Sequence, residues 1–235
     1  MTSELLFEFD RSFNTQVIGT DEAGRGPAAG GVFAAAVMFE KVTEGLIKDL
    51  AILNDSKKLT AKKRESIYDI IKNNTLNKIV CVEVEEIEKI NILNASLKAM
   101  NIACSAIVKH PETLILVDGN KLIKNFEYNQ QYVIKGDSKS ASIAAASILA
   151  KVTRDRYMEK LHGEFPMYNW AKNAGYLTKE HLDAIDKYGL CKYHRPSHRK
   201  RKRLRSCRFF HHGRNSLCDP CKSSSDRNRR SCRPL

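Results

Sequence analysis

Two adjacent carboxylates end an apolar run near the N-terminus, and a glycine-rich stretch follows them. Asp21 and Glu22 come directly after Val17–Thr20, and the chain continues as Ala-Gly-Arg-Gly at 23–26. At neutral pH, neighbouring carboxylates repel and raise each other's pKa unless a cation intervenes. Hard divalent cations such as Mg²⁺ and Mn²⁺ prefer oxygen ligands of this kind. Bare glycine backbone and the Arg25 guanidinium suit a phosphate or sugar held close to the main chain. The stretch therefore predicts a metal site beside a polyanion site.

The pattern of apolar residues predicts an α/β fold. We expect strands at 17–20, 31–39, 78–84, 113–118 and 131–135, where short apolar runs are rich in β-branched residues. We expect helices at 41–53, from Thr60 onward, and at 92–108, 138–163 and 178–188. The first two strands, separated by the glycine turn, are typical of a hairpin. This order indicates one mixed sheet flanked by helices, with a helical C-terminal portion.

Four acidic residues follow or end the predicted strands: Asp21, Glu22, Asp118 and Asp137. If the strands ending at Asp21 and Asp118 are parallel neighbours, both carboxylates emerge at one edge of the sheet, where ligands of open α/β sheets bind. Asp21 and Glu22 would point to opposite faces of a regular strand, so we expect the chain to leave the strand there. The ordinary interpretations are a turn at Asp118 and a helix N-cap at Asp137. Together the acidic positions favour a two-metal centre.

The positive charge is concentrated in the last residues. The 235-residue chain has a formal net charge of +13, of which the segment 199–235, with 13 Lys and Arg and 2 Asp, contributes +11. The total charge therefore does not identify the preceding part as a nucleic-acid-binding protein. No apolar run has the length of a membrane helix, and the N-terminus lacks the basic start of a signal peptide. We expect a cytoplasmic protein without membrane association.

Six segments resemble the motifs of one enzyme family, prokaryotic ribonuclease HII. They are DEAGRGP at 21–27, NDSKKL at 54–59, LVDGN at 116–120, KGDSK at 135–139, SIAAASILAKVTRD at 142–155 and GYLTKEH at 175–181. They occur in the family's order and at roughly its spacing, which is far more specific than a single motif. The resemblance covers about 17–197. It implies a ribonuclease-H-like fold and cleavage of RNA in RNA–DNA hybrids, including single ribonucleotides embedded in duplex DNA, with Mn²⁺ or Mg²⁺ as cofactor.

The resemblance also implies roles for particular residues. The acidic centre would consist of Asp21, Glu22, Asp118 and Asp137. Two ions held by carboxylates can generate hydroxide, align it with the scissile phosphorus and stabilise the leaving 3′-oxygen. Cleavage would then leave 3′-hydroxyl and 5′-phosphate ends.

The remaining implied roles concern the substrate. Gly24, Arg25 and Gly26 would read the ribose 2′-hydroxyl, mainly through the backbone. This hydroxyl is the group that distinguishes RNA from DNA at a given site. Tyr176 would stack on the sugar of the adjoining nucleotide, and Lys57 would contact a phosphate.

The resemblance ends after Ser197. We expect residues 1–198 to form the catalytic domain and 199–235 a basic, disordered extension, because few large apolar residues remain to build a core. Such an extension would add salt-dependent attraction to DNA. A zinc knuckle, or an extension that is non-native or frame-shifted, is also compatible with the composition. The knuckle's ligands would come from Cys207, His211, His212, Cys218 and Cys221, although only Cys218 and Cys221 have ligand-like spacing.

Two other functions are compatible with part of the pattern. Another metal-dependent nuclease, or a transposase-like enzyme of a related fold, would share the acidic residues and lack the reader of the 2′-hydroxyl. A non-catalytic nucleic-acid-binding protein would depend on the basic tail. We expect the partners to be RNA–DNA hybrids and ribonucleotide-containing DNA duplexes, and the protein to act as a monomer.

Overall fold

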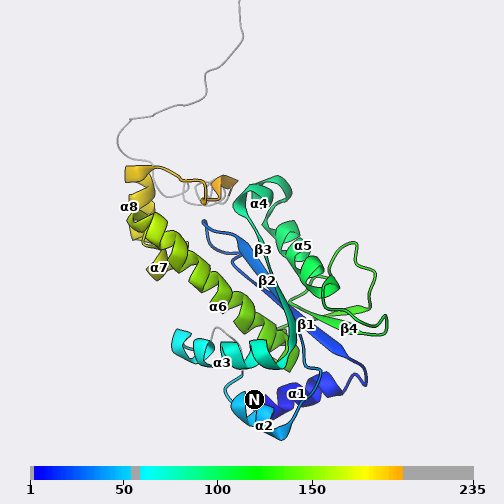
Figure 1. Ribbon diagram of the computed structural model, residues 1–235. Coiled ribbons are helices and arrows are strands. Elements are labelled where there is room, and N and C mark those ends of the chain that lie inside the picture. Colours follow the sequence, from blue (N-terminus) through cyan, green and yellow to red (C-terminus); the bar gives the residue numbers. More distant parts are fainter. Residues whose placement is uncertain (1–2, 54–58, 198–235) are drawn as a thin grey trace, which may run out of the picture.

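The computed structural model describes residues 3–53 and 59–197 (Figure 1). Its helices and strands, in chain order, are α1 (Ser3–Arg11), β1 (Val17–Ala23), β2 (Val32–Met38), α2 (Glu44–Asp49), α3 (Ala61–Asn74), β3 (Leu76–Val82), α4 (Val84–Ile90), α5 (Ile92–Ser105), β4 (Leu114–Asp118), β5 (Gln130–Val133), η1 (Gly136–Ser138), α6 (Ala141–Glu164), η2 (Pro166–Tyr168), α7 (Trp170–Asn173) and α8 (Lys179–Tyr188).

The five strands form one mixed sheet in the order β3-β2-β1-β4-β5. β2 pairs antiparallel with β1 and with β3, so the predicted hairpin of the first two strands is confirmed. β4 is parallel to both β1 and β5. The expectation of a mixed sheet flanked by helices is therefore confirmed, and β1 lies at its centre with an antiparallel neighbour on one side and a parallel one on the other.

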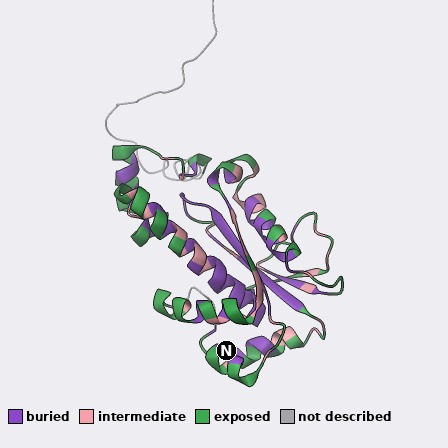
Figure 2. Ribbon diagram, viewed as in Figure 1, coloured by how far each residue is buried: buried purple, intermediate pink, exposed green. Residues whose placement is uncertain are grey.

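Helices cover both faces of the sheet, and alternate residues of β2 contact the two layers. Ala35 and Val37 belong to an apolar cluster with residues of α1, α2, α3 and α6, whereas Ala34 and Ala36 belong to a second cluster with residues of α5. Figure 2 shows the buried strands between the helices, whose outer surfaces are exposed. Burial on both faces explains why β2 is apolar at every position.

The long helix α6 packs closely on β1 because both elements carry small residues at the contact. Ala144, Ala145 and Ala146 are fully buried in the cluster that contains Ala35. Gly19 lies against the start of the helix, where an added Cβ atom would come within 2.2 Å of the Ile143 backbone nitrogen. The sheet and α6 therefore meet at backbone distance at Gly19, two residues before Asp21.

The C-terminal helices pack on the far end of α6 (Figure 1). Tyr168 and Trp170 stack with ring centroids 5.0 Å apart, and they share an apolar cluster with Met158 of α6 and Ile185 of α8. The backbone nitrogen of Ala28 donates to the carbonyl of Gly175 at 2.9 Å. This hydrogen bond joins the helical portion to the loop that follows β1.

Several boundaries differ from the sequence-based expectation. The predicted elements include neither α1 nor α4, and both are short helices whose stability comes from the burial of a few residues such as Leu6, Phe7 and Ile87. The predicted strand at 78–84 ends earlier, because Val84 already begins α4. The predicted cap of α3 is confirmed: Thr60 accepts a hydrogen bond from the Lys63 nitrogen at 3.3 Å. No helix in the described ranges is long and apolar enough to cross a membrane.

The contact at Gly19 predicts a sharp stability difference between two glycines. We expect Gly19→Ala to lower the free energy of unfolding by about 3 kcal/mol or more, since the new methyl group meets rigid backbone. Urea unfolding followed by the fluorescence of the buried, single tryptophan, Trp170, measures the change. Gly163→Ala is the matched control, because an added Cβ there has nothing within 4 Å; it should raise stability by up to about 1 kcal/mol. Equal effects would contradict the backbone contact.

Candidate active site

A pocket of about 230 Å³ lies at the carboxyl ends of β1 and β4. Its wall combines acidic side chains, the glycine-rich turn, polar side chains of α6 and one tyrosine. The lining residues are Asp21, Glu22, Ala23, Gly24, Arg25, Gly26, Asp118, Ser147, Lys151, Arg154 and Tyr176. Of the residues assigned to the site from sequence, the pocket wall contains all that lie in the described ranges except Asp137.

Strand register places Asp21 beside Asp118. The parallel ladder of β1 and β4 runs to the pair Thr20 and Val117, so the two aspartates are the next residues on their strands. Asp21 is buried, and Asp118 is partly exposed. Two carboxylates from strands far apart in the chain therefore converge on one pocket.

The expectation that the chain leaves the strand at Asp21 and Glu22 was wrong. β1 continues to Ala23, and the two acidic residues pair with Ala35 and Ala34 of β2. The parallel ladder with β4 has already stopped at Thr20, which leaves that edge of β1 open. Both carboxylates line the pocket from within the sheet.

Asp137 lies next to the pocket and not in its wall. It is buried in the short η1 turn, and the preceding Gly136 donates its backbone N–H to Asp118 Oδ1 at 2.7 Å. The helix cap that was considered for Asp137 belongs to Ser140, whose hydroxyl accepts from the Ile143 nitrogen at 3.2 Å. The role of Asp137 in the acidic centre stays a prediction.

Burial and like charge act together on Asp21. Removal from solvent raises the pKa of the Asp21 carboxyl well above its ordinary value, and the negative charges of Glu22 and Asp118 raise it further. Hydrogen bonds from Ser147 and from the Glu22 backbone act in the opposite direction. A cation in the pocket would relieve this repulsion, because an opposite charge favours the ionised carboxylates.

The chemistry of these donors fits a hard divalent ion. Within the described residues, no three His, Cys, Asp or Glu side chains form a ready metal-binding group. Glu22 Oε1 instead pairs with the Arg25 guanidinium at 3.2 Å, and Asp118 Oδ1 holds the Gly136 amide. Oxygen donors from Asp21, Glu22 and Asp118 are those that Mg²⁺ and Mn²⁺ prefer.

The glycine turn and Tyr176 form the opposite wall of the pocket. Gly24 has a φ of +105°, which other residues rarely adopt, and an added Cβ atom there would lie 2.4 Å from Arg154 Nε. At Gly26 an added Cβ would lie 3.2 Å from Cε1 of the Tyr176 ring. The ring is half exposed, at 51%. Glycine at 26 therefore leaves the space in which the tyrosine approaches the turn.

Comparison with known proteins identifies the family of this fold and site. Residues 18–202 match the family model of ribonuclease HII. The chain belongs to the ribonuclease HII family. Members of this family cleave RNA in RNA–DNA hybrids.

Relatives in several bacteria are similar over most of the chain. Ribonuclease HII of Endomicrobium trichonymphae is 46% identical over 197 residues, which cover 81% of this chain and 90% of that protein. Ribonuclease HII of Pelagibacter ubique is 50% identical over 177 residues, with 75% of this chain and 92% of that protein covered.

Solved structures share the fold. Ribonuclease H2 from Pyrococcus horikoshii matches with a TM-score of 0.61 and 28% identity, over 81% of this chain and 99% of that one. Bst ribonuclease HIII, solved in complex with Mn²⁺, matches with a TM-score of 0.62 and 18% identity, over 88% of this chain and 73% of that one. The ribonuclease-H-like fold expected from the motifs is confirmed.

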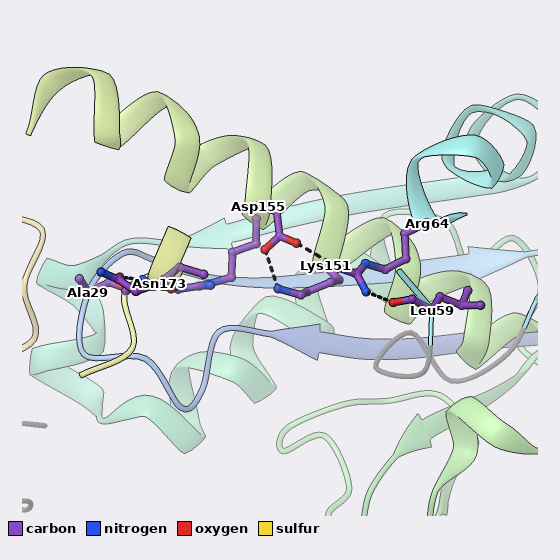
Figure 3. A network of polar contacts seen from close by, with 9 residues as sticks. Ala29, Leu59, Arg64, Lys151, Asp155 and Asn173 are labelled. Atoms are coloured by element: carbon purple, nitrogen blue, oxygen red, sulfur yellow. Dashed lines mark hydrogen bonds and ion pairs between the residues drawn. The ribbon is translucent and has the colours of Figure 1, made fainter. Parts of the chain in front are cut away.

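Sequence reasoning missed three polar residues of α6 that line the site in this ribonuclease HII family member. Ser147, Lys151 and Arg154 line the pocket, although the sequence analysis gives no site role to any residue of the helix predicted at 138–163. A spacing of four and then three residues places them on one face of the helix, and this polar stripe in an apolar helix is the signal that identifies them. Lys151 pairs with Asp155 at 2.6 Å, and Asp155 also faces Arg64 at 3.7 Å (Figure 3).

A buried histidine pair holds the backbone of Tyr176. His181 Nδ1 lies 2.9 Å from the Tyr176 carbonyl, which can only accept, so Nδ1 carries the proton. His181 Nε2 therefore accepts from Trp170 Nε1 at 3.1 Å and from His194 Nε2 at 3.1 Å. His194 Nδ1 in turn accepts from the Cys191 amide at 3.0 Å. The network requires both imidazoles to be neutral.

Two of the sequence-based assignments lie outside the described residues. Lys57, expected to contact a phosphate, falls in 54–58, and the tail 199–235 with its cysteine and histidine residues also falls outside. Both therefore stay predictions.

The histidine network predicts a pH-dependent loss of stability. Burial lowers the pKa of His181, against the hydrogen bond to the Tyr176 carbonyl, which raises it. The unfolded chain takes up a proton at this histidine near pH 6.5, and the folded chain does so only at lower pH. The stabilisation that neutral His181 gives to the folded state is therefore fully present above about pH 6.5 and is lost as the pH falls. When the pH is lowered from about 7.5 to 5.5, the free energy of unfolding, measured with urea, should fall by about 1 kcal/mol more for the wild type than for His181→Asn. Identical pH slopes would contradict the neutral pair.

Proposed function

We propose that this enzyme hydrolyses the phosphodiester bond at ribonucleotides, both in RNA–DNA hybrids and at single ribonucleotides in duplex DNA, with two divalent ions. The observation that carries the proposal is the shared pocket of Asp21, Glu22 and Asp118 with the Gly24–Gly26 turn and Tyr176. A centre suited to phosphoryl chemistry and a turn suited to close backbone contact with a sugar thus border the same space.

The carboxylates would hold Mg²⁺ or Mn²⁺. Asp21, Glu22 and Asp118 supply oxygen donors from adjacent strand ends, and Asp137 is the fourth candidate, one residue from the amide that holds Asp118. When bound, the ions supply an activated water and stabilise the leaving oxygen, with 3′-hydroxyl and 5′-phosphate ends as products. The divalent-metal dependence of the family and the Mn²⁺ complex of the related Bst enzyme agree with this choice of ion.

The chain's own residues would place the phosphate and exclude DNA at the cleavage site. Arg25 is half exposed and, once released from Glu22, can donate to a phosphate oxygen. Lys151 lines the same pocket as a second cation. Backbone amides of the turn can hydrogen bond a ribose 2′-hydroxyl, the group absent from DNA, while Tyr176 contacts the adjoining sugar. We propose that the enzyme acts as a monomer in the cytoplasm.

Asp21→Asn should abolish cleavage and metal binding while the fold is retained. We expect kcat on a duplex with one ribonucleotide to fall about 10³-fold or more, equivalent to about 4 kcal/mol. Mn²⁺ should raise the thermal midpoint of the wild type, because it binds only the folded state. It should not raise that of the variant. Without metal, the thermal midpoint of the variant should lie above that of the wild type. The substitution removes a buried carboxylate that Glu22 and Asp118 repel.

The matched control is Asp49→Asn, at an exposed aspartate of α2 that is not among the residues lining the pocket. It should keep both the cleavage rate and the Mn²⁺-induced rise of the midpoint. Near wild-type cleavage by Asp21→Asn would refute the assignment of the metal site.

Gly26→Ala should impair ribonucleotide recognition more than Arg25→Ala. The methyl group would meet the Tyr176 ring at 3.2 Å, whereas Arg25 is expected to act mainly through its backbone. We expect kcat/KM on a single-ribonucleotide duplex to fall about 10- to 100-fold for Gly26→Ala, or about 1.4 to 2.7 kcal/mol, and less than about 10-fold for Arg25→Ala. Gly24 is a poorer probe, because its positive φ and its contact with Arg154 would distort the turn itself.

The same assay separates this proposal from a general nuclease. An all-DNA duplex of identical sequence should remain uncut by the wild type. Cleavage of this duplex at a rate comparable to that of the single-ribonucleotide duplex would contradict recognition of the 2′-hydroxyl. A reversed order of the Gly26 and Arg25 variants would argue against recognition by the backbone.

A further inference from the structure

Arg195 is a buried arginine whose guanidinium is surrounded by carbonyl oxygens of the loop 24–31. It is 2% exposed. Its Nη1 donates to the Gly24 carbonyl at 2.7 Å and to the Pro27 carbonyl at 3.0 Å. Nε donates to Gly30 at 2.7 Å, and Nη2 donates to Gly30 and Gly31. Every nitrogen of the guanidinium group thus donates to the backbone of one loop.

The loop is also held by the backbone on either side of it. Ala28 accepts a hydrogen bond from the Arg195 amide at 2.7 Å and donates to the Gly175 carbonyl at 2.9 Å. Gly30 donates to the Tyr193 carbonyl at 2.8 Å. The segment that ends at Arg195 and the turn that carries Tyr176 therefore enclose the loop from two sides.

Arg195 reaches these carbonyls without a carboxylate partner in any ion pair found among the described residues. Burial and the charge of the nearby Arg154 lower its pKa to about 9, against the opposing effect of Glu88. A charge that is buried beside another cation is costly unless hydrogen bonds compensate for it. Here the compensation comes from the loop carbonyls, so the position of the loop and the position of the cation depend on each other.

Arg154 holds the same loop from α6. Its Nη2 donates to Ala29 at 3.2 Å and to Ala174 at 3.1 Å. Its side chain also fills the space beside Gly24 in which a Cβ atom would lie. Two buried guanidinium groups therefore fix the loop, one from the core helix and one from the C-terminal segment.

The contact with Gly24 determines the direction of an amide that borders the pocket. In a trans peptide the C=O of one residue and the N–H of the next point in opposite directions, and no cis peptide occurs in the described chain. Because the Gly24 carbonyl points to Arg195, the Arg25 N–H points away from it. The Pro27 carbonyl shows the same geometry, since the following Ala28 N–H points to Gly175 on the other side.

We propose that Arg195 is a positioning residue for ribonucleotide recognition, which orients the Gly24–Arg25 peptide so that its N–H faces the substrate. The inference rests on the proposed function, because it concerns the group that would read the 2′-hydroxyl. Arg195 itself does not line the pocket, and it acts through the backbone that it holds. A lysine cannot replace it, since one ammonium group lacks the planar fork that reaches four separate carbonyls.

The test compares Arg195→Lys and Arg195→Ala with Arg156→Ala, an exposed arginine of α6 that pairs with Glu65. Dissociation constants are measured by fluorescence anisotropy in EDTA, for a duplex with one ribonucleotide and for the same duplex as all-DNA. We expect the ratio of the two constants to approach 1 in both Arg195 variants, with kcat/KM in Mn²⁺ reduced about 10-fold or more. Arg156→Ala should keep the wild-type ratio. Circular dichroism and the Mn²⁺-induced rise of the thermal midpoint establish that each variant is folded and retains its metal site.

Each outcome decides the matter. Arg195→Lys that is folded, binds Mn²⁺ and keeps the wild-type ratio would overturn the proposal, because a merely structural role lowers the thermal midpoint without changing selectivity. Loss of Mn²⁺ binding in Arg195→Lys would also overturn it, since the effect would then not be confined to recognition. If Arg195→Ala fails to fold, Arg195→Lys alone decides. A wild type with no preference for the ribonucleotide duplex would instead refute the proposed function.

Discussion

The parallel pairing of β1 with β4 is the constraint on which the site depends. It carries Asp21 and Asp118, which are 97 positions apart in the chain, to the same edge of the sheet, and it ends at Thr20, so that the edge of β1 is open where the carboxylates stand. Gly19, one residue earlier, lets α6 approach at backbone distance and bring Ser147 within hydrogen-bonding reach of Asp21. Strand register and a missing side chain together place like charges in a buried position.

Opposite charges are distributed around this pocket in two separate groups. The carboxylates repel one another at the strand ends, whereas the buried guanidinium groups of Arg154 and Arg195 lie beneath the glycine loop. Neither group is neutralised by the other through an ion pair within the described ranges, and only Glu22 reaches a cation of the site, Arg25. The hydrogen bonds of the two buried guanidinium groups go instead to the carbonyls of the loop and its neighbours.

Much of this architecture could be predicted from sequence, because apolar runs, caps and family motifs are local signals. The hairpin, the Thr60 cap and the strand end at Asp118 belong to this class. The continuation of β1 through Asp21 and Glu22 could not be predicted from the chain alone, since it depends on which neighbour of β1 stops pairing first. The role of Arg195 depends on contacts with residues more than 120 positions away, for which a single sequence carries no signal.

The separation of Arg195 from Gly24, 171 positions along the chain, has a consequence for biosynthesis. Contacts of such range require closure of a long stretch of chain, and their entropic cost slows folding. During translation the strands that bear the carboxylates emerge first, and Arg195 emerges only after α8. On a nascent chain the carbonyls of the glycine loop therefore lack their guanidinium partner until all five strands and α8 have been synthesised.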